Sequence, residues 1–167
     1  MLTTIALIAA GTLAALALGA LLLPRTVTVT RSGHVSLSPA EVIAMASSSD
    51  GYQRFNPYCS TDPNLKITPF GPAAGVGSGF AFEGKEGKGT QTVTDVTRSE
   101  VHYLIDLGAM GKPRQVIRAT ASGTGSEITW TVTSDLGMNP IFRIFGLFMD
   151  GMLGKVYERG LRNMAAA

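Results

Sequence analysis

The ionisable side chains that could catalyse a reaction are few and lie far apart in the sequence. Two histidines and one cysteine are a poor supply of soft metal ligands. No Gly-x-Ser-x-Gly, His-Glu-x-x-His, Walker or Cys-x-x-Cys motif is present. We therefore expect no metal and no cofactor, and no catalytic residue is assigned. The groups that could act as an acid or a base in a pocket are His34, His102, Asp106, Asp135, Glu83 and Asp150.

His102 and Asp106 show why these groups make a weak catalytic set. Both alternate with Tyr103 and Ile105 along a predicted strand, so their side chains point to the opposite face of the sheet. If the apolar face lines a pocket, His102 and Asp106 point away from it. We expect these two residues and His34 to be solvated or hydrogen-bonded locally.

Aromatic and methionine side chains offer a different chemistry, because together they could line a cavity for an apolar molecule. Any one aromatic residue is more often part of a core. As a set they recur on one face of the predicted strands and along the last predicted helix. The residues predicted to bind a ligand are Tyr52, Phe55, Tyr58, Phe80, Phe82, Tyr103, Ile105, Trp130, Phe145, Met149 and Met152.

The elements that must position these side chains begin with a strand. Apolar and polar residues alternate over Thr26–Leu37, which is typical of a half-buried strand. Ser38, with Pro39 at the first helical position and Glu41 three residues after the serine, is typical of a capping box. This pattern predicts a short helix that continues to Ala46.

A second short helix is expected after the serine run at 47–49, with Asp50 as its cap and Pro57 as its end. From 65 to 133 the sequence changes to short apolar segments separated by glycine and proline turns. Such segments predict an antiparallel meander. The fold class is therefore α+β, with a curved antiparallel sheet wrapped around a long C-terminal helix and two short helices after the first strand.

The C-terminal helix is expected to begin at Asn139-Pro140 and to be amphipathic. Gly146, Gly151, Gly154 and Gly160 fall inside it, and each costs up to about 1 kcal/mol relative to alanine in a helix interior. Some gain must offset this cost. Close packing on the sheet would do so, as would room for a ligand or for a bend beside a pocket.

An uncharged apolar segment opens the chain. The run Leu2–Leu23 would span about 33 Å as a helix, enough to cross a bilayer. We expect a retained transmembrane anchor. A cleaved signal peptide is the main alternative, but no basic residue precedes the run and no small-x-small cleavage site follows it; a buried core helix is the other. Arg25 and Arg31 follow the run, which favours a domain on the cytoplasmic side of a single-pass protein.

The expected domains are the transmembrane anchor at 1–24 and one folded domain at 25–167, which is long enough for a single core. The net charge is only +2, and the lysines and arginines are scattered. We expect no nucleic-acid partner, because a phosphate backbone requires a clustered basic surface. The single cysteine, Cys59, excludes an intrachain disulfide.

Several short segments share their residues with one known superfamily, and these are Ser38-Pro39-Ala40-Glu41-Val42, the aromatic stretch 52–58, Asp62-Pro63-Asn64-Leu65-Lys66, Gly71-Pro72, Gly75-Val76-Gly77, Phe82-Glu83-Gly84, Ile128-Thr129-Trp130-Thr131, Gly146-Leu147-Phe148-Met149-Asp150 and Gly160-Leu161-Arg162-Asn163. Through them the chain resembles, over about Thr26 to Met164, the polyketide cyclase/dehydrase and lipid-transport-like proteins of the SRPBCC (START-like, Bet v 1-like) superfamily. The resemblance implies a helix-grip fold with a hydrophobic pocket between the sheet and the last helix. Where similar proteins carry tryptophans after the first helix, this chain has Tyr52, Phe55 and Tyr58.

We expect from this a membrane-anchored module that binds a small hydrophobic ligand, lipid-like or quinone-like, between the sheet and the C-terminal helix. Because one fold serves many functions, two alternatives stay open. One is a cyclase or dehydratase that acts on a hydrophobic substrate, with Tyr103, Glu83 or Asp135 as acid or base. The other is a protein-interaction module without a ligand, whose cavity is filled by side chains.

Overall fold

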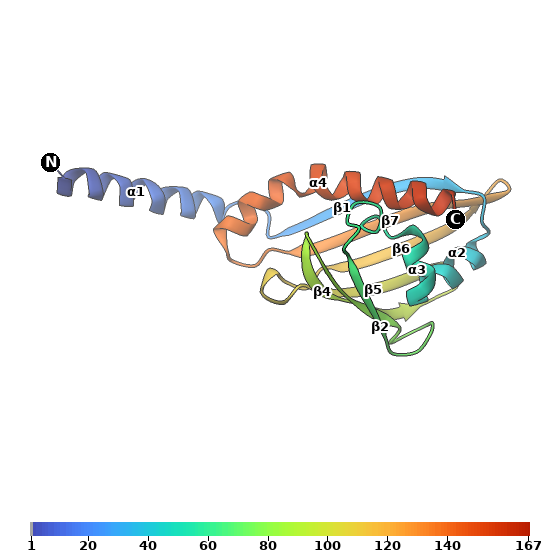
Figure 1. Ribbon diagram of the computed structural model, residues 1–167. Helices are drawn as coiled ribbons and strands as arrows, with labels where there is room; N and C mark the ends of the chain where they lie inside the picture. Colours follow the sequence, from blue (N-terminus) through green and yellow to red (C-terminus); the bar gives the residue numbers. More distant parts are fainter. Residues whose placement is uncertain (1) are drawn as a thin grey trace.

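The computed structural model describes residues 2–167, apart from the side chains at positions 2, 9, 13, 14 and 17. A seven-stranded sheet curves beneath a long C-terminal helix, with two short helices at one end (Figure 1). In chain order the elements are α1 (Leu2–Ala20), β1 (Thr26–Val35), α2 (Pro39–Ala46), α3 (Ser49–Phe55), β2 (Lys66–Phe70), β3 (Gly79–Gly84), β4 (Gly87–Val96), β5 (Glu100–Asp106), the 3-10 turn η1 (Gly108–Met110), β6 (Arg114–Ser122), β7 (Gly125–Asp135) and α4 (Pro140–Ala165).

The sheet has the strand order β1-β7-β6-β5-β4-β3-β2, and every neighbouring pair is antiparallel. The meander and the α+β fold class are therefore confirmed, and the arrangement is consistent with a helix-grip fold. One register shift separates Val93 from Asp95 on β4. Val93 is buried, whereas Asp95 is exposed and pairs in register with His102. Strict alternation would place Asp95 on the face of Val93, and the bulge moves it to the opposite face.

The short helices begin at serine caps. The capping box predicted at Ser38 is confirmed, since the Glu41 backbone N–H donates to Ser38 Oγ over 3.4 Å and the Ser38 N–H donates to the Glu41 carboxylate over 2.8 Å. Helix α3 begins two residues earlier than predicted from Asp50. Its cap is Ser48, whose Oγ accepts a hydrogen bond from the Gly51 N–H at 2.9 Å. Ser48 has the extended backbone that a cap requires.

Helix α4 packs closely on the sheet at three glycines. A Cβ at Gly160 would overlap the indole ring of Trp130, and a Cβ at Gly154 would overlap the guanidinium of Arg31. A Cβ at Gly146 would overlap side chains of β1 and of the β7–α4 loop. Close packing therefore explains why these three positions lack a side chain.

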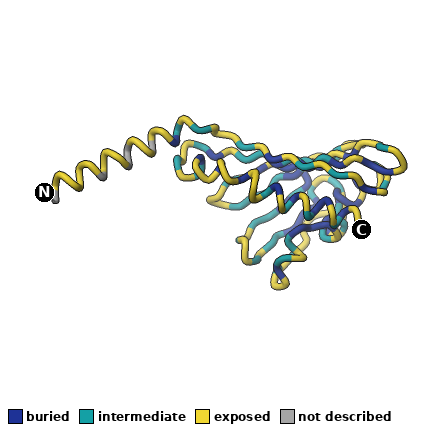
Figure 2. Tube along the Cα trace, turned by 90° about the horizontal axis from the view of Figure 1, so that it is seen from above, coloured by how far each residue is buried: buried dark blue, intermediate teal, exposed yellow. Residues whose placement is uncertain are grey.

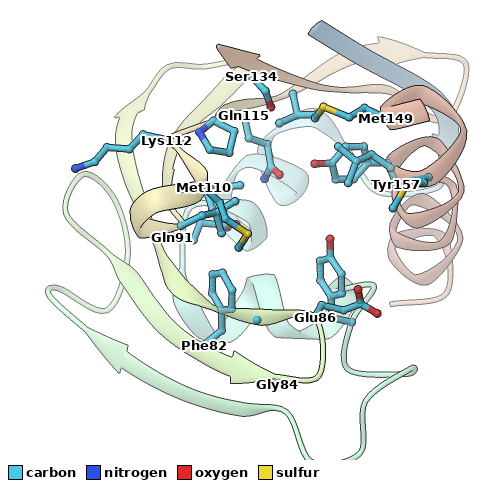
Figure 3. A pocket seen from close by; sticks show the side chains of 18 of the residues that line it. Phe82, Gly84, Glu86, Gln91, Met110, Lys112, Gln115, Ser134, Met149 and Tyr157 are labelled. Atoms are coloured by element: carbon cyan, nitrogen blue, oxygen red, sulfur yellow. The ribbon is translucent and has the colours of Figure 1, made fainter. Parts of the chain in front are cut away.

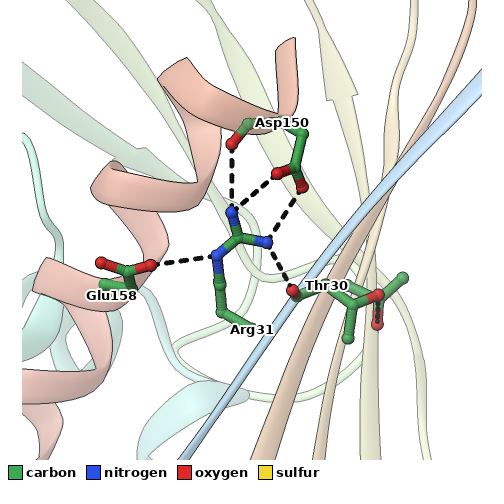
Figure 4. Close-up of polar contacts among 5 residues, drawn as sticks. Thr30, Arg31, Asp150 and Glu158 are labelled. Carbon is green, nitrogen blue, oxygen red and sulfur yellow. Dashed lines mark hydrogen bonds and ion pairs between the residues drawn. The ribbon is translucent and has the colours of Figure 1, made fainter.

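Arg31 on β1 joins the edge of the sheet to α4 (Figure 4). Its Nη1 and Nη2 donate to the two carboxylate oxygens of Asp150 over 2.9 and 3.0 Å, and its Nε donates to Glu158 over 3.1 Å. Both carboxylates are exposed to solvent, so each pair adds modest stability. The bidentate geometry nevertheless sets the position of α4 along β1.

The predicted transmembrane anchor is wrong. No helix among the described residues is both long and apolar enough to cross a membrane. Helix α1 ends at Ala20, and its 19 residues span about 28 Å instead of the expected 33 Å. Residues 21–23 leave the helix in a turn directly before Pro24, and Arg143 of α4 donates hydrogen bonds to the carbonyls of Leu21 and Leu23.

The predicted single-pass localisation, with the folded domain in the cytoplasm, is therefore also wrong. Figure 2 shows the described side chains of α1 exposed along the helix as far as Ala20, which is buried. The boundary between residues 24 and 25 stays a prediction. It agrees with the start of β1 at Thr26.

We predict that Gly160→Ala lowers the free energy of unfolding by about 1–3 kcal/mol, because the added methyl group must displace a fully buried indole ring. Gly151→Ala makes the same change on the same helix where no atom lies within 4 Å. It should raise the free energy of unfolding by up to about 1 kcal/mol through helix propensity. Urea unfolding followed by circular dichroism measures both, and equal effects of the two substitutions would contradict the packing account.

Candidate functional site

A cavity of about 360 Å³ lies between the concave face of the sheet and α4 (Figure 3). Strands β3 to β7 form one wall, and the first two thirds of α4 form the other. Helix α3 and the loop after it close one end. Most of the lining is apolar, and it includes Phe80, Phe82, Ile105 and Val132 from the sheet and Phe142, Phe145, Met149, Met152, Leu153 and Tyr157 from α4.

Most of the residues predicted to bind a ligand line this cavity. Phe55, Tyr103 and Trp130 do not line it. Alternation along β5 and β7 puts Tyr103 beside Ile105 and Trp130 beside Val132 on one inward face. The members of the predicted set that line the cavity are Tyr52, Tyr58, Phe80, Phe82, Ile105, Phe145, Met149 and Met152.

The three other residues belong to the buried hydrophobic core. The Phe55 and Trp130 rings are 5.6 Å apart in an edge-to-face arrangement, and Trp130 stacks on Tyr157 at 5.0 Å. The Tyr103 hydroxyl donates to the Ala46 carbonyl oxygen over 2.7 Å. At this end of the sheet α2 packs on β5 and β6, and α3 packs against α2 and α4. Side chains there meet each other instead of open space.

Two glutamines on the inner face of the sheet were missed by the sequence reasoning. Gln91 on β4 and Gln115 on β6 are only 5% and 1% exposed, and both line the cavity. Figure 3 shows the Gln115 amide projecting into the space. Strand alternation could have identified both glutamines as inward-facing, because Gln115 shares its strand face with the apolar residue Ile117 and Gln91 shares its face with Val93.

These glutamines differ in their hydrogen bonds. Gln115 Nε2 donates to the Tyr52 hydroxyl oxygen over 3.3 Å. Gln91 Nε2 is buried and has no hydrogen-bond partner among the described residues. A buried donor without a partner costs about 1–3 kcal/mol of stability. The Gln91 side chain therefore keeps one buried N–H group without a hydrogen bond.

Tyrosine hydroxyls are the other polar groups of the inner cavity. Tyr52, Tyr58 and Tyr157 line it, and burial raises the pKa of each above that of a free tyrosine. Burial also raises the pKa of Tyr103. The cavity hydroxyls therefore stay protonated at neutral pH and can donate hydrogen bonds.

Several charged side chains line the cavity or lie beside it, and among the described residues Glu86 is one that has no ion-pair partner. The Asp135 carboxylate accepts two hydrogen bonds from the Arg25 guanidinium, at 2.8 and 2.9 Å, and this pairing lowers the pKa of Asp135 to about 2. Lys112 contacts Asp106 at 2.7 Å. Asp62 accepts backbone N–H bonds from Asn64 and Lys85. Asp135 and Lys112 are therefore engaged by opposite charges, and Asp62 is engaged by the backbone.

The acid and base candidates occupy separate places. Tyr103 and Glu83 do not line the cavity, and Asp135 lines it but is held by Arg25. His102 bonds to Glu100 at 2.8 Å, outside the cavity. Asp106, His34 and Asp150 also lie outside the lining. Within the described part of the chain, no group of three or more histidine, cysteine, aspartate or glutamate side chains could hold a metal ion.

Comparison with known proteins gives one family and many similar folds. Residues 26–167 match the family described as polyketide cyclase/dehydrase and lipid transport. No curated protein sequence matches the chain. Ara h 8.0201 superposes with a TM-score of 0.60 at 12% identity, covering 85% of this chain and 99% of its own length.

Two further solved structures show the same fold. Protein CV1439 from Chromobacterium violaceum has a TM-score of 0.61 at 12% identity, with 84% of this chain and 96% of that chain covered. The di-domain ARO/CYC StfQ from the steffimycin biosynthetic pathway has a TM-score of 0.60 at 10% identity, with 84% of this chain and 50% of that chain covered. At these identities the likeness concerns the fold alone.

We predict that no tyrosine of the folded chain titrates near pH 10. Because each folded-state pKa is raised, the tyrosines contribute stability below about pH 10 and this stability is lost as the pH rises above that value. Absorbance at 295 nm should therefore show tyrosinate only as circular dichroism shows unfolding. In 8 M urea all four tyrosines should titrate near pH 10. A tyrosine that ionises near pH 10 in the native fold would contradict this burial.

Proposed function

Because the chain belongs to the polyketide cyclase/dehydrase and lipid transport family, we propose that it binds a small hydrophobic molecule in the cavity between the sheet and α4. The observation that carries this proposal is the cavity of about 360 Å³ with mainly apolar walls. Ligand pockets usually have volumes of about 300–1,000 Å³, mostly apolar walls and a few polar groups. Unfilled apolar space costs stability, which a bound molecule would offset.

The walls favour a lipid-like or quinone-like ligand. Phe80 and Phe82 present aromatic surfaces from β3, which suit flat apolar rings. Met149 and Met152 face them from α4. Methionine side chains adapt to ligands of varied shape, because they are unbranched and polarizable. Both the sheet and the helix would therefore contact the ligand.

The two alternatives have less support. A protein-interaction module would be favoured by a cavity filled with side chains, whereas this cavity is open. An enzyme would need two free ionisable groups directed at one point of the ligand. Asp135 is engaged by Arg25, and Glu83 lies outside the lining. StfQ is described as an ARO/CYC, but at 10% identity its similarity to this chain supports a shared fold and not a shared reaction.

Native mass spectrometry of the purified full-length chain, followed by organic extraction, tests the proposal. We expect a copurified apolar molecule that is released on unfolding. Trp130 supplies a second readout, because it stacks on Tyr157 at the cavity wall. The absence of any bound molecule, together with Trp130 fluorescence that ignores added lipids and quinones, would contradict binding.

We predict that Ile105→Trp weakens the binding of 2-methyl-1,4-naphthoquinone at least about tenfold, because the larger side chain occupies cavity space. Leu104→Trp is the matched control. Leu104 is the neighbouring residue on β5, it does not line the cavity, and its side chain points to the opposite face. Its dissociation constant should stay within about twofold of the parent chain. Equilibrium dialysis measures both constants, and equal losses would place the ligand outside the cavity.

A further inference from the structure

We propose that the chain forms a two-fold symmetric dimer in which α1 of each copy packs on the outer face of α4 of the other copy. The partner for this face is therefore an uncharged helix of a second copy. The inference goes beyond the proposed function and does not depend on it, because no ligand takes part in the contact between the helices.

Helix α4 is apolar on two opposite faces over its first half. Its inner face, with Gly146 and Gly154, packs closely on the sheet. Its outer face carries large apolar side chains that are 45–71% exposed, namely Ile141, Ile144, Leu147 and Phe148. Ile141, Ile144 and Phe148 have the i, i+3, i+7 spacing with which one helix packs on another. An exposed apolar patch of this kind marks an interaction surface.

The charges of α4 limit what can bind there. From Pro140 to Met152 only Arg143 and Asp150 are charged. Arg143 is buried against the turn after α1, and Asp150 is bound by Arg31 of β1. The outer face itself carries no charge. Its partner should therefore be apolar, because a charged partner would lose its hydration without gaining an ion pair.

Helix α1 has the character that this face requires. None of its 19 residues is charged. Among its described side chains, Ile5, Leu7, Ile8, Leu16 and Leu18 are each more than 60% exposed. Ile5, Ile8 and Leu16 share one side of the helix, since they follow the i, i+3, i+11 spacing. A helix that is apolar on all sides needs to be covered.

The directions of the two helices assign α1 to a second copy. Figures 1 and 2 show α1 leaving the domain where α4 begins and pointing away from α4. Hydrogen bonds from Arg143 hold the turn between them. A two-fold axis at this turn would place each α1 antiparallel along the α4 of the other copy. Helix α1 is about 28 Å long and the outer face from Ile141 to Met152 about 17 Å, so α1 can cover that face.

Two such contacts form in each dimer. Together they bury on the order of 1,000–1,500 Å² of surface, the size of a specific protein–protein interface. Phe145 and Met152 flank the outer face, are about half-exposed and also line the cavity. The partner's α1 therefore contacts two side chains of the cavity wall.

Sedimentation velocity of the purified full-length chain tests the proposal. We expect twice the mass of the 17.5 kDa chain at micromolar concentration. Phe148→Glu places a charge in the apolar contact and should raise the dissociation constant of the dimer at least about 100-fold. Val76→Glu is the matched control. Val76 is 60% exposed, as Phe148 is 61%, but it lies between β2 and β3, so the dissociation constant should stay within about twofold.

A pair of opposite charges tests which surfaces meet. Leu16 on α1 and Phe148 on α4 lie at similar distances from the turn, so the two-fold axis brings them together. Leu16→Lys alone should weaken the dimer as Phe148→Glu does. Both substitutions in one chain should bind at least about tenfold more tightly than either alone, because the introduced charges attract each other across the interface.

Every other outcome overturns the proposal. A chain that stays monomeric has no such contact. A dimer that Phe148→Glu leaves intact, or that the double substitution weakens further, pairs through other surfaces, such as α1 on α1. Monomers that float with phosphatidylcholine vesicles would assign the outer face of α4 to a lipid surface. Circular dichroism checks the fold of each variant, and Ile141→Glu, at a position that is 71% exposed, replaces Phe148→Glu should that chain not fold.

Discussion

The contact between Gly160 and the ring of Trp130 sets how closely α4 approaches the sheet. Trp130 is fully buried and cannot yield, so the C-terminal part of the helix rests directly on β7. Arg31 occupies the space beside Gly154 and ties the same helix to the edge strand β1. The helix thus follows one edge of a curved sheet. The concave face beyond it, from β3 to the C-terminal end of β7, is left to the cavity.

The same arrangement sorts aromatic residues into two roles. Where helix and sheet touch, rings pack on one another, as Phe55 and Trp130 do. Where the helix stands away from the strands, the next inward positions, such as Ile105 and Met149, face open space. Two residues that are two positions apart on one strand share the same face of the sheet. One can therefore be part of the core while the other lines the cavity, and the residue types alone do not distinguish them.

Polar groups are sorted by charge. Asp135 and Lys112 of the lining are paired with Arg25 and Asp106, so their electrostatic interactions are satisfied before a ligand arrives. The interior keeps neutral donors, the amides of Gln91 and Gln115 and the tyrosine hydroxyls. In an apolar interior an unmade neutral hydrogen bond is costly, but far less costly than an unpaired charge. A cavity of this kind is better suited to recognising a neutral molecule than to moving protons.

The sequence alone determined the local features: the capping box at Ser38, the alternating strands of the meander, and the long C-terminal helix that begins after Asn139. These depend on neighbours in the chain, whose spacing is visible in the residues. Only the tertiary structure showed that the turn after α1 is bound to α4, since Arg143 donates hydrogen bonds to the carbonyls of residues 21 and 23 from a distant helix. It alone also decided which inward residues line the cavity and that Gln91 is left without a partner. These outcomes depend on how closely α4 packs, and that distance is set by contacts between residues far apart in the chain.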